Sequence, residues 1–316
     1  PVLGLSALLF AVFALKAGVV PFQFWVPSAY RAAPSPVTAM LAGVVKKVGV
    51  YAVVRLYFGV FAAATLPVSI PFVEGTSVLS FFGPILFAMA TASILFGGFG
   101  AIGRDDLNGV LAYSSISQIG FVVLPLGLAA AIPSIRSLAI FAALVYALNH
   151  ALAKGLLFLV SGTIQDATGS TDLHDVSGVA RTSPIVAGAF LVGGLALIGI
   201  PPLAGFFGKL FVFRTAIAAA SPIGLAVALA GGVLTIAYVS RTWNRGFWGR
   251  PPAIVEDASP DRIEVVVLVA LALAIVLVGV GFDPIYRFAE AASRAALDRA
   301  AYVDAVDLHS LGGGHA

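Results

Sequence analysis

The sequence contains no cysteine and little charge. None of its 316 residues is Cys, and only 10% are Asp, Glu, Lys or Arg. The absence of cysteine excludes disulfides, thiolate-held iron–sulfur clusters and a cysteine nucleophile. Soluble domains carry about 25% charged residues. The low charge, together with a mean hydropathy of +1.03, therefore indicates an integral membrane protein.

Acidic residues are missing from the middle of the apolar segments, whereas lysine occurs only inside such segments. The lysines are Lys16, Lys46, Lys47, Lys154 and Lys209. Charge is costly in hydrocarbon, so ionisable residues placed there usually mark an ion or proton path. The net charge of +3 is small and dispersed, and it favours no nucleic-acid partner.

The N-terminal residues lack both an initiator Met and a basic segment before the first apolar run. This combination disfavours a signal peptide. We expect the chain to be a fragment that lacks its N-terminal part.

Long apolar runs predict eight transmembrane segments. They occupy residues 2–29, 35–61, 77–100, 105–128, 134–163, 184–219, 222–247 and 263–282. Proline interrupts two of these runs, at Pro21 and at Pro201-Pro202, and proline breaks or kinks a helix. The sequence therefore predicts an all-α integral membrane fold of about eight transmembrane helices, two of them broken.

The segment after the eighth run predicts a C-terminal amphipathic helix. Phe288, Ala292 and Ala295 fall on its apolar face. We expect this helix to lie on the membrane surface or against a neighbouring subunit. Residues 309–316 predict no regular structure, and their two histidines are too sparse for a metal site.

Arginines gather on one side of the predicted topology when the runs alternate across the membrane. That side receives Arg31, Arg104, Arg181, Arg241, Arg245, Arg250 and Arg262. The interhelical loops on the other side offer only Arg136. The positive-inside rule makes the arginine-rich side cytoplasmic, although Arg287, Arg294 and Arg299 in the tail oppose this assignment.

A lysine accompanies each proline break. Lys16 lies five residues before Pro21, and Lys209 lies seven residues after Pro202. Paired broken helices are typical of transporters built from inverted repeats, with the ion site at the breaks. The alternative is a kinked helix whose lysine extends to the membrane interface.

The fifth run carries a polar row. Tyr146, His150 and Lys154 recur at four-residue intervals and share one helix face. A lone histidine on an apolar face is usually a satisfied core residue, but the flanking tyrosine and lysine favour a proton relay.

In the second run, Lys46 and Lys47 point about 100° apart on a helix. Both therefore cannot face one cavity, and we favour Lys47 as the inward lysine.

The serines and glutamine of residues 114–118 suit either hydrogen bonds to neighbouring helices or bound water. The GFGAIG stretch at residues 98–103 follows no strand, so we interpret it as helix packing rather than a dinucleotide site.

Four segments resemble one known family. LKAGVVPFQFWVPSAYRAAPSPVTAMLAGVVKKVGVYAVVR is similar to the seventh and eighth helices of antiporter-like subunits of respiratory complex I and of Mrp-type multisubunit cation/proton antiporters. LAYSSISQIGF, NHALAKGLLFLVSG and GIPPLAGFFGKLF resemble three further family segments, in family order. The closing AASRAALDRAAYVDAV looks most like the D subunit of Mrp Na⁺/H⁺ antiporters, so the chain resembles a C-terminal fragment of such a subunit.

The resemblance implies a domain plan. Residues 1–61 would end the first inverted repeat, 77–247 would form the second, 263–282 the last transmembrane helix and 284–316 the amphipathic tail. The eight runs would be the seventh to the fourteenth helices of a family member. The family's glutamate in the fifth helix, which pairs with the lysine matched by Lys16, has no counterpart here.

The resemblance also implies residue roles. Lys16 matches the lysine at the break of the seventh helix, Lys47 the bridging lysine of the eighth, and Lys209 the lysine of the broken twelfth. His150 and Lys154 match the central polar positions of the eleventh. Lys46 is an extra neighbour, and Tyr146 stands where some relatives have a second histidine.

The implied function is proton translocation along these residues in an Na⁺/H⁺ antiporter of a prokaryotic plasma membrane, with other membrane subunits as partners. No cofactor and no metal are expected. The alternatives are a proton-pumping subunit of complex I or a membrane-bound hydrogenase, the only case in which the chain would belong to an enzyme, and a membrane scaffold without a proton path.

Overall fold

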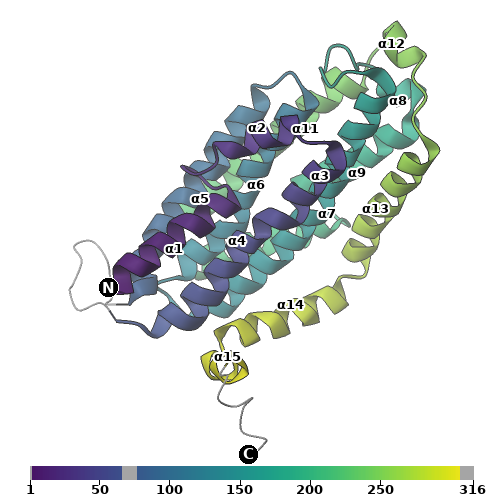
Figure 1. Cartoon of the computed structure of the whole chain (residues 1–316). Coiled ribbons are helices and arrows are strands. Elements are labelled where there is room, and N and C mark those ends of the chain that lie inside the picture. The colour runs from purple at the N-terminus through teal and green to yellow at the C-terminus, as the bar shows by residue number, and fades with distance from the viewer. Residues whose placement is uncertain (1, 66–76, 307–316) are drawn as a thin grey trace, which may run out of the picture.

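The computed structural model describes residues 2–65 and 77–306. The predicted irregular end, residues 309–316, lies outside these ranges. Within them the chain is helical, with two isolated β-bridges, and the long helices run side by side as a bundle (Figure 1).

In chain order the elements are α1 (Val2–Ala17), α2 (Trp25–Ala32), α3 (Ser35–Met40), η1 (Leu41–Val45), α4 (Lys46–Ala52), η2 (Val53–Val60), η3 (Phe61–Ala63), α5 (Val78–Ile102), α6 (Leu107–Ala129), η4 (Pro133–Ile135), α7 (Arg136–Thr168), α8 (Val179–Thr182), α9 (Pro184–Ile198), α10 (Ala204–Ala218), α11 (Pro222–Thr242), η5 (Trp243–Phe247), α12 (Ala253–Glu256), α13 (Arg262–Val280), α14 (Phe282–Leu297) and α15 (Arg299–Val306). Of these, η1, η2 and η5 are π-helical and η3 and η4 are 3₁₀ turns.

The predicted membrane fold is confirmed. Six helices of the described chain are long and apolar enough to cross a membrane. They are Ser35–Ala63, Val78–Ile102, Leu107–Ala129, Pro133–Thr168, Pro222–Phe247 and Arg262–Val280. Two shorter apolar helices, Leu3–Ala17 and Pro184–Ile198, fall in the two runs predicted to be broken.

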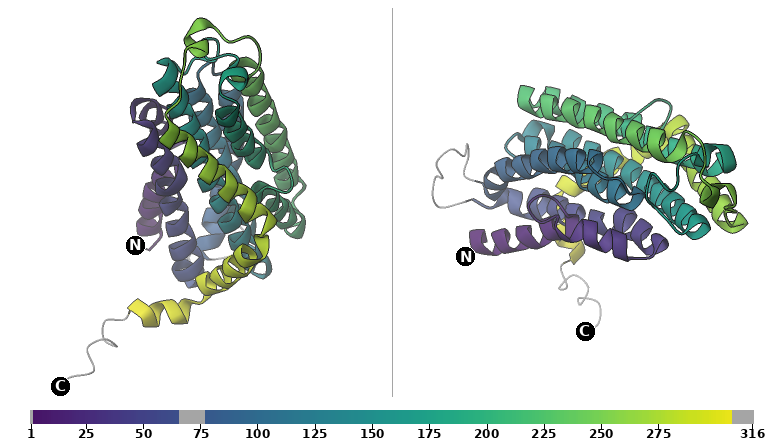
Figure 2. Two further views of the ribbon diagram at one scale, coloured as in Figure 1. Left: turned by 90° about the vertical axis from the view of Figure 1, so that its right-hand side faces the viewer. Right: turned by 90° about the horizontal axis from the view of Figure 1, so that it is seen from above.

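The central helix of the bundle is α6. It packs against α2, α5, α7, α10 and α11, and its side chains are buried on nearly every side. Seen from above, the N-terminal helices lie on one side of the bundle and α11 on the other (Figure 2). Groups on α6 can therefore be reached from several helices at once.

Both predicted helix breaks are confirmed, between α1 and α2 and between α9 and α10. A glycine with positive φ ends the first half of each, Gly18 at 65° and Gly199 at 92°. This left-handed conformation closes the last carbonyls of a helix, and glycine adopts it without a steric penalty. A cis peptide bond then precedes Pro21 in the first break and Pro202 in the second.

The interpretation of GFGAIG as helix packing is confirmed for two of its glycines. A Cβ placed on Gly98 would lie 2.7 Å from Cδ1 of Leu234 in α11. One placed on Gly100 would lie 2.8 Å from Cε1 of Tyr113 in α6. Their hydrogen side chains let α5 approach both neighbouring helices.

Gly205 is where α10 packs most tightly on α9. A Cβ there would overlap the Ala196 carbonyl oxygen, and backbone atoms cannot move aside cheaply. We expect Gly205→Ala to destabilise the protein by about 1–3 kcal/mol, measured as a lower thermal unfolding temperature in detergent. Gly188→Ala in α9 is the control, because no heavy atom lies within 4 Å of its added Cβ. Equal unfolding temperatures for the two variants would contradict this packing.

The C-terminal helix α14 is amphipathic as predicted, and the face that packs on its own chain is not the one with Phe288 and Ala295. It lies across the end of the bundle away from α12 (Figure 1) and packs on α7 and η2 of its own chain. Its first residue, Phe282, stacks on Phe207 of α10 with ring centroids 3.9 Å apart. This anchor sets the rotation of the helix, so that Ala289 is buried while Phe288 is 75% exposed and Ala295 is exposed.

Candidate functional site

Helix α6 places polar side chains in the middle of the bundle. Ser114, Ser115, Ser117 and Gln118 are all fully buried. The sequence left two interpretations open, and the structure shows that each of the four hydrogen-bonds a neighbouring helix. Ser117 ties α6 to α5 by donating to the Ile94 carbonyl at 2.9 Å, while the other three face lysines and tyrosines.

Lys46 reaches α6 from the start of α4 and is fully buried. Its Nζ donates to the carbonyl oxygen of Ser115 at 3.3 Å and lies 3.5 Å from the Ser115 hydroxyl. The ring of Tyr30 stands 6.0 Å from the same nitrogen. The amine therefore has two oxygen partners and an aromatic face in the protein interior.

Lys154 reaches the neighbouring serine of α6 from α7 and is also fully buried. Its Nζ donates to the Leu111 carbonyl at 2.9 Å and to the Ser114 hydroxyl. Ser114 in turn donates to the Leu111 carbonyl at 3.1 Å. Two lysines from two helices therefore meet adjacent serines on α6.

His150 lies one turn before Lys154 on α7, as the spacing predicts, and is fully buried. Neither of its ring nitrogens has a hydrogen-bond partner among the described residues. The positive charges that act on it are those of Lys47, Lys154 and Lys46. An imidazole with both nitrogens unpaired next to several amines is placed to accept or pass on a proton.

The structure brings both adjacent lysines towards the polar interior. Lys46 is fully buried, whereas Lys47 is partly exposed, its Nζ donates to the Ala42 carbonyl, and its charge acts on His150. The π-helical η1 immediately precedes Lys46. A π turn holds more residues than an α turn, which changes the direction in which the following side chains point.

Lys16 was expected to face the bundle interior, and this expectation is wrong for the described chain. Its side chain is exposed and lines a groove of about 480 Å³ together with Trp25 and Leu41. The buried face of α1 carries Ala14 and Ala17 instead, because that face packs closely on α4.

Lys209 on α10 is buried, with 5% of its side chain exposed. Its Nζ has no hydrogen-bond partner within the described ranges and lies 5.0 Å from the ring centroid of Phe121 on α6. Phe121 stacks on Tyr146 of α7 at 5.5 Å. The residue also borders a groove of about 300 Å³ between α10 and α11. We refer to Lys46, Lys154, His150 and Lys209 as the buried row.

Gln118 is the centre of a cluster that sequence reasoning did not identify. It accepts a hydrogen bond from the Tyr146 hydroxyl and donates to the hydroxyls of Thr235 at 3.1 Å and Tyr238 at 2.7 Å. Thr235, Tyr238 and Thr242 recur at helical spacing on α11, which is the signal that would have revealed a polar face there.

No carboxylate pairs with the buried row among the described residues, where the ion pairs found all use arginine. The partners of Lys46 and Lys154 are carbonyl and hydroxyl oxygens. Burial without a counter-ion disfavours a permanent charge on an amine. Such groups can take up and release protons as their neighbours change state.

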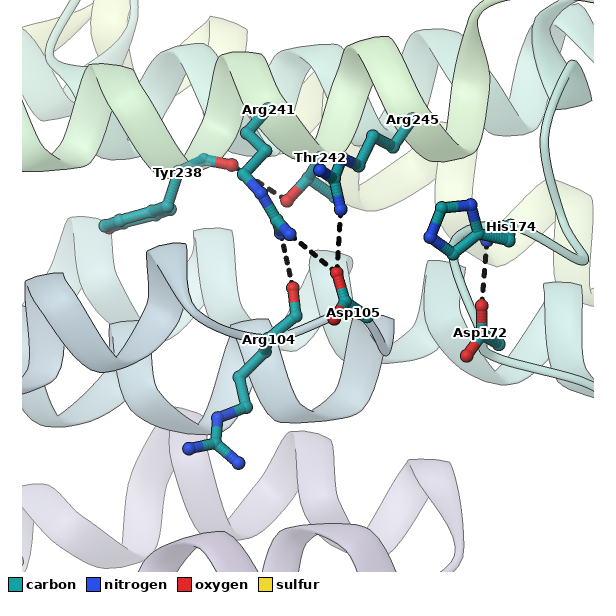
Figure 3. Close-up of polar contacts among 8 residues, drawn as sticks. All are labelled: Arg104, Asp105, Asp172, His174, Tyr238, Arg241, Thr242 and Arg245. Atoms are coloured by element: carbon teal, nitrogen blue, oxygen red, sulfur yellow. Dashed lines mark hydrogen bonds and ion pairs between the residues drawn. The ribbon is translucent and has the colours of Figure 1, made fainter.

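The arginine-rich end of the bundle is held by ion pairs outside the row (Figure 3). Arg241 of α11 and Arg245 of η5 both reach Oδ1 of Asp105, at 2.6 and 2.8 Å. The loop after α5 is thereby tied to the end of α11. Arg31, at the end of α2, pairs with Asp106 at 2.6 Å. The cytoplasmic orientation of this end is a prediction from the distribution of arginines.

Asp105 gives this end a pH dependence. The hydrogen bond from Arg241, aided by the charges of Arg241, Arg245 and His174 and opposed by desolvation, holds the pKa of its carboxyl below the ordinary 3.8. A depressed pKa stabilises the folded state above the unfolded pKa, and this contribution is lost as pH falls through the folded pKa.

We therefore expect Asp105→Asn to lower the thermal unfolding temperature slightly at neutral pH. The difference from the parent should disappear at pH values below the folded pKa of Asp105. Unfolding scans in detergent at several pH values check this. A difference that is the same at every pH would assign the effect to packing and not to the ion pairs.

Comparison with known proteins gives a consistent family. The family model described as NADH:quinone oxidoreductase/Mrp antiporter, TM, matches residues 2–235. The D subunit of the Na⁺/H⁺ antiporter from Alkalihalophilus pseudofirmus is 32% identical over 308 residues, which cover 96% of this chain and 58% of the relative. The N subunit of the NADH-quinone oxidoreductase from Desulforudis audaxviator is 37% identical over 243 residues, covering 76% and 45%.

Among solved structures, a chain of the Mrp complex from Dietzia sp. superimposes with a TM-score of 0.81 at 26% identity, covering 95% of this chain and 60% of that one. The chain spans 58% of the length of the D subunit from Alkalihalophilus pseudofirmus. With a family match over most of its residues and this fold, the chain belongs to the NADH:quinone oxidoreductase/Mrp antiporter transmembrane family.

Proposed function

We propose that the chain is part of the proton-translocating subunit of a multisubunit Na⁺/H⁺ antiporter. The observation that carries this proposal is the buried row. Its amines and imidazole lie in the protein interior, without carboxylate partners among the described residues, and Lys46 and Lys154 contact adjacent hydroxyls of α6. A structural scaffold has no need of buried cations at this cost, whereas a proton path needs groups that exchange protons.

In this proposal protons move in the membrane plane from Lys46 through Lys154 and His150 to Lys209. Lys47 joins the path beside His150, on which its charge acts. Lys16 joins only when a further segment covers the groove that it lines. Residues 1–61 and 77–247 would belong to two inverted repeats, a division that the similar glycine–proline breaks of α1 and α9 support.

The relatives supply the proposed setting. Since they include the D subunit of an Na⁺/H⁺ antiporter and a chain of an Mrp complex, we propose other membrane subunits as partners, H⁺ and Na⁺ as the ions, and a prokaryotic plasma membrane as the location. A second candidate is a proton-pumping subunit of a redox-driven complex, favoured by the 37% identity to a subunit of an NADH-quinone oxidoreductase.

One experiment separates the two candidates. Everted membrane vesicles that contain the assembled complex are given an artificial pH gradient, and no respiratory substrate is added. We expect added Na⁺ to dissipate the gradient, as followed with a pH-sensitive dye. Proton movement that ignores Na⁺ and requires a reductant would overturn the antiporter proposal in favour of the redox-driven one.

A further inference from the structure

Gln118 makes three hydrogen bonds to two other helices from a fully buried position. Its Oε1 accepts from the Tyr146 hydroxyl of α7, and its Nε2 donates to Thr235 and Tyr238 of α11. The amide thus has a partner on each side. Gln118 therefore links α7, the helix that carries His150 and Lys154, to α11.

Thr235 fixes which way the amide points. Its hydroxyl has one hydrogen and donates it to the Gly231 carbonyl at 2.7 Å, which can only accept. Towards Gln118, 3.1 Å away, Thr235 can therefore only accept. The atom of Gln118 that faces Thr235 must be the nitrogen, so the amide oxygen faces Tyr146.

The orientation of the amide fixes the Tyr146 hydroxyl in turn. Since Oε1 of Gln118 cannot donate, the single hydrogen of the Tyr146 hydroxyl is directed at Gln118. The hydroxyl oxygen keeps lone pairs but has no hydrogen to offer elsewhere. In this state Tyr146 can accept a hydrogen bond from a protonated neighbour and cannot donate one to a neutral neighbour.

Tyr146 stands on the contact chain that leads from Lys209 to the rest of the buried row. The Lys209 amine lies over Phe121, Phe121 stacks on Tyr146, and Tyr146 is one turn before His150 on α7. Gly208, next to Lys209, lies directly against the Tyr146 ring, because a Cβ there would be 2.8 Å from its Cδ2. The ring is therefore packed from α6 and α10 at once.

We propose that Gln118 is a positioning residue that keeps the Tyr146 hydroxyl an acceptor and so sets the proton connection between His150 and Lys209. The inference rests on the proposed proton path. The Tyr146 hydroxyl then favours the protonated form of a relay group that donates to it. Among titratable groups, His150 and Lys154 follow one and two turns later on α7, Lys209 follows Gly208, which packs on the Tyr146 ring, Tyr238 of α11 lies on the other side of Gln118, and Lys46 of α4 is further along the row.

Gln118→Met and Tyr146→Phe test this inference in the assembled complex. Each removes the directed hydrogen bond, and Tyr146→Phe does so without removing the ring that stacks on Phe121. We expect each variant to slow Na⁺-driven proton movement by at least about tenfold. We also expect Gln118→Met to shift the pH profile of this proton movement to lower pH, because a freed Tyr146 hydroxyl can donate to a neutral neighbour and so favours its neutral form. The double variant should be no slower than either single variant, as expected for two residues that act through one bond.

Tyr238→Phe is the matched control. It also breaks a buried hydrogen bond of Gln118, but Thr235 still holds the amide oxygen towards Tyr146. We expect it to keep the parent rate within about twofold and the parent pH profile. An equal loss in Tyr238→Phe would show that the cluster acts only by holding helices together, and would overturn the inference.

Lys209→Met separates this inference from the proposed function. If it abolishes transport while Gln118→Met and Tyr146→Phe keep the parent rate and pH profile, the inference alone fails. If Lys209→Met itself transports like the parent, the proposed path fails. Should Gln118→Met not assemble, Tyr146→Phe decides alone, and parent-like behaviour in that variant overturns the inference.

Discussion

Lys209→Met is expected to assemble with its partner subunits and to lose most Na⁺-driven proton movement, by at least about tenfold. The Nζ of Lys209 has no hydrogen-bond partner in the described part of the chain, so methionine leaves no polar group unpaired behind it. Methionine also has similar bulk, whereas alanine would open a cavity whose packing loss could imitate a transport defect. Everted vesicles with a pH-sensitive dye, together with the yield of purified complex, measure the two properties separately.

Two variants on the same helix sharpen this result. Lys209→Arg keeps the charge but does not readily release a proton, and we expect it to be as slow as Lys209→Met. Arg214→Met removes a cation from the exposed side of α10 and should leave transport near the parent rate. Parent-like transport by Lys209→Met would make Lys209 a structural residue and would refute the proposed end of the path.

Lys154→Met is the second change for which we expect a large effect, again at least about tenfold in Na⁺-driven proton movement. Lys154 donates to Ser114 and lies one turn after His150 on α7, so its loss interrupts the proposed path in the middle. Assembly should survive, because Ser114 retains its own hydrogen bond to the Leu111 carbonyl at 3.1 Å. The same vesicle assay and the same yield of complex check both statements.

Ser117→Ala is the control for Lys154→Met. It deletes a fully buried hydroxyl from α6, the helix that Lys154 contacts, but that hydroxyl donates to the Ile94 carbonyl of α5 and lies outside the row. We expect near-parent transport with a modest loss of stability. If Ser117→Ala and Lys154→Met lose transport equally, the defect follows from disturbing α6, and the relay assigned to Lys154 is wrong.

The sequence predicted the breaks of the first and sixth runs because proline acts through local geometry. A missing N–H and a fixed φ interrupt a helix wherever the chain places them, and both interruptions are present between α1 and α2 and between α9 and α10. The shared face of Tyr146, His150 and Lys154 was equally predictable, since α7 is a regular helix at these positions.

Side-chain directions in the second span were not predictable in this way. Regular helical spacing holds only for α turns, and this span contains the π-helical segments η1 and η2. Hydrophobic periodicity does not mark a π turn, and the sequence therefore did not predict that Lys46 would be fully buried beside Lys47. For Lys16 and Phe288, the outward direction depends on which face of the helix packs on its neighbours.

Gln118 shows a different limit of sequence reasoning. Its three partners come from α7 and α11, far apart in the chain. The sequence offers a polar residue in an apolar run, which suits a water site as well as a hydrogen-bonded one. Only the packing of α7 and α11 on α6 decides between them.

The most direct test of the proton path restores an amine by chemistry. The chain has 0 cysteines, so Lys209→Cys introduces a single thiol in it, next to a groove of about 300 Å³ that small reagents can enter. Bromoethylamine converts this thiol into an aminoethyl thioether, which mimics lysine, whereas iodoethane gives a neutral ethyl thioether. The parent complex treated in the same way controls for thiols of partner subunits.

We predict that Lys209→Cys loses Na⁺-driven proton movement, that aminoethylation restores it, and that ethylation does not. Equal transport by the ethylated and aminoethylated proteins, or no recovery after aminoethylation verified by mass spectrometry, would contradict a proton-carrying amine at this position.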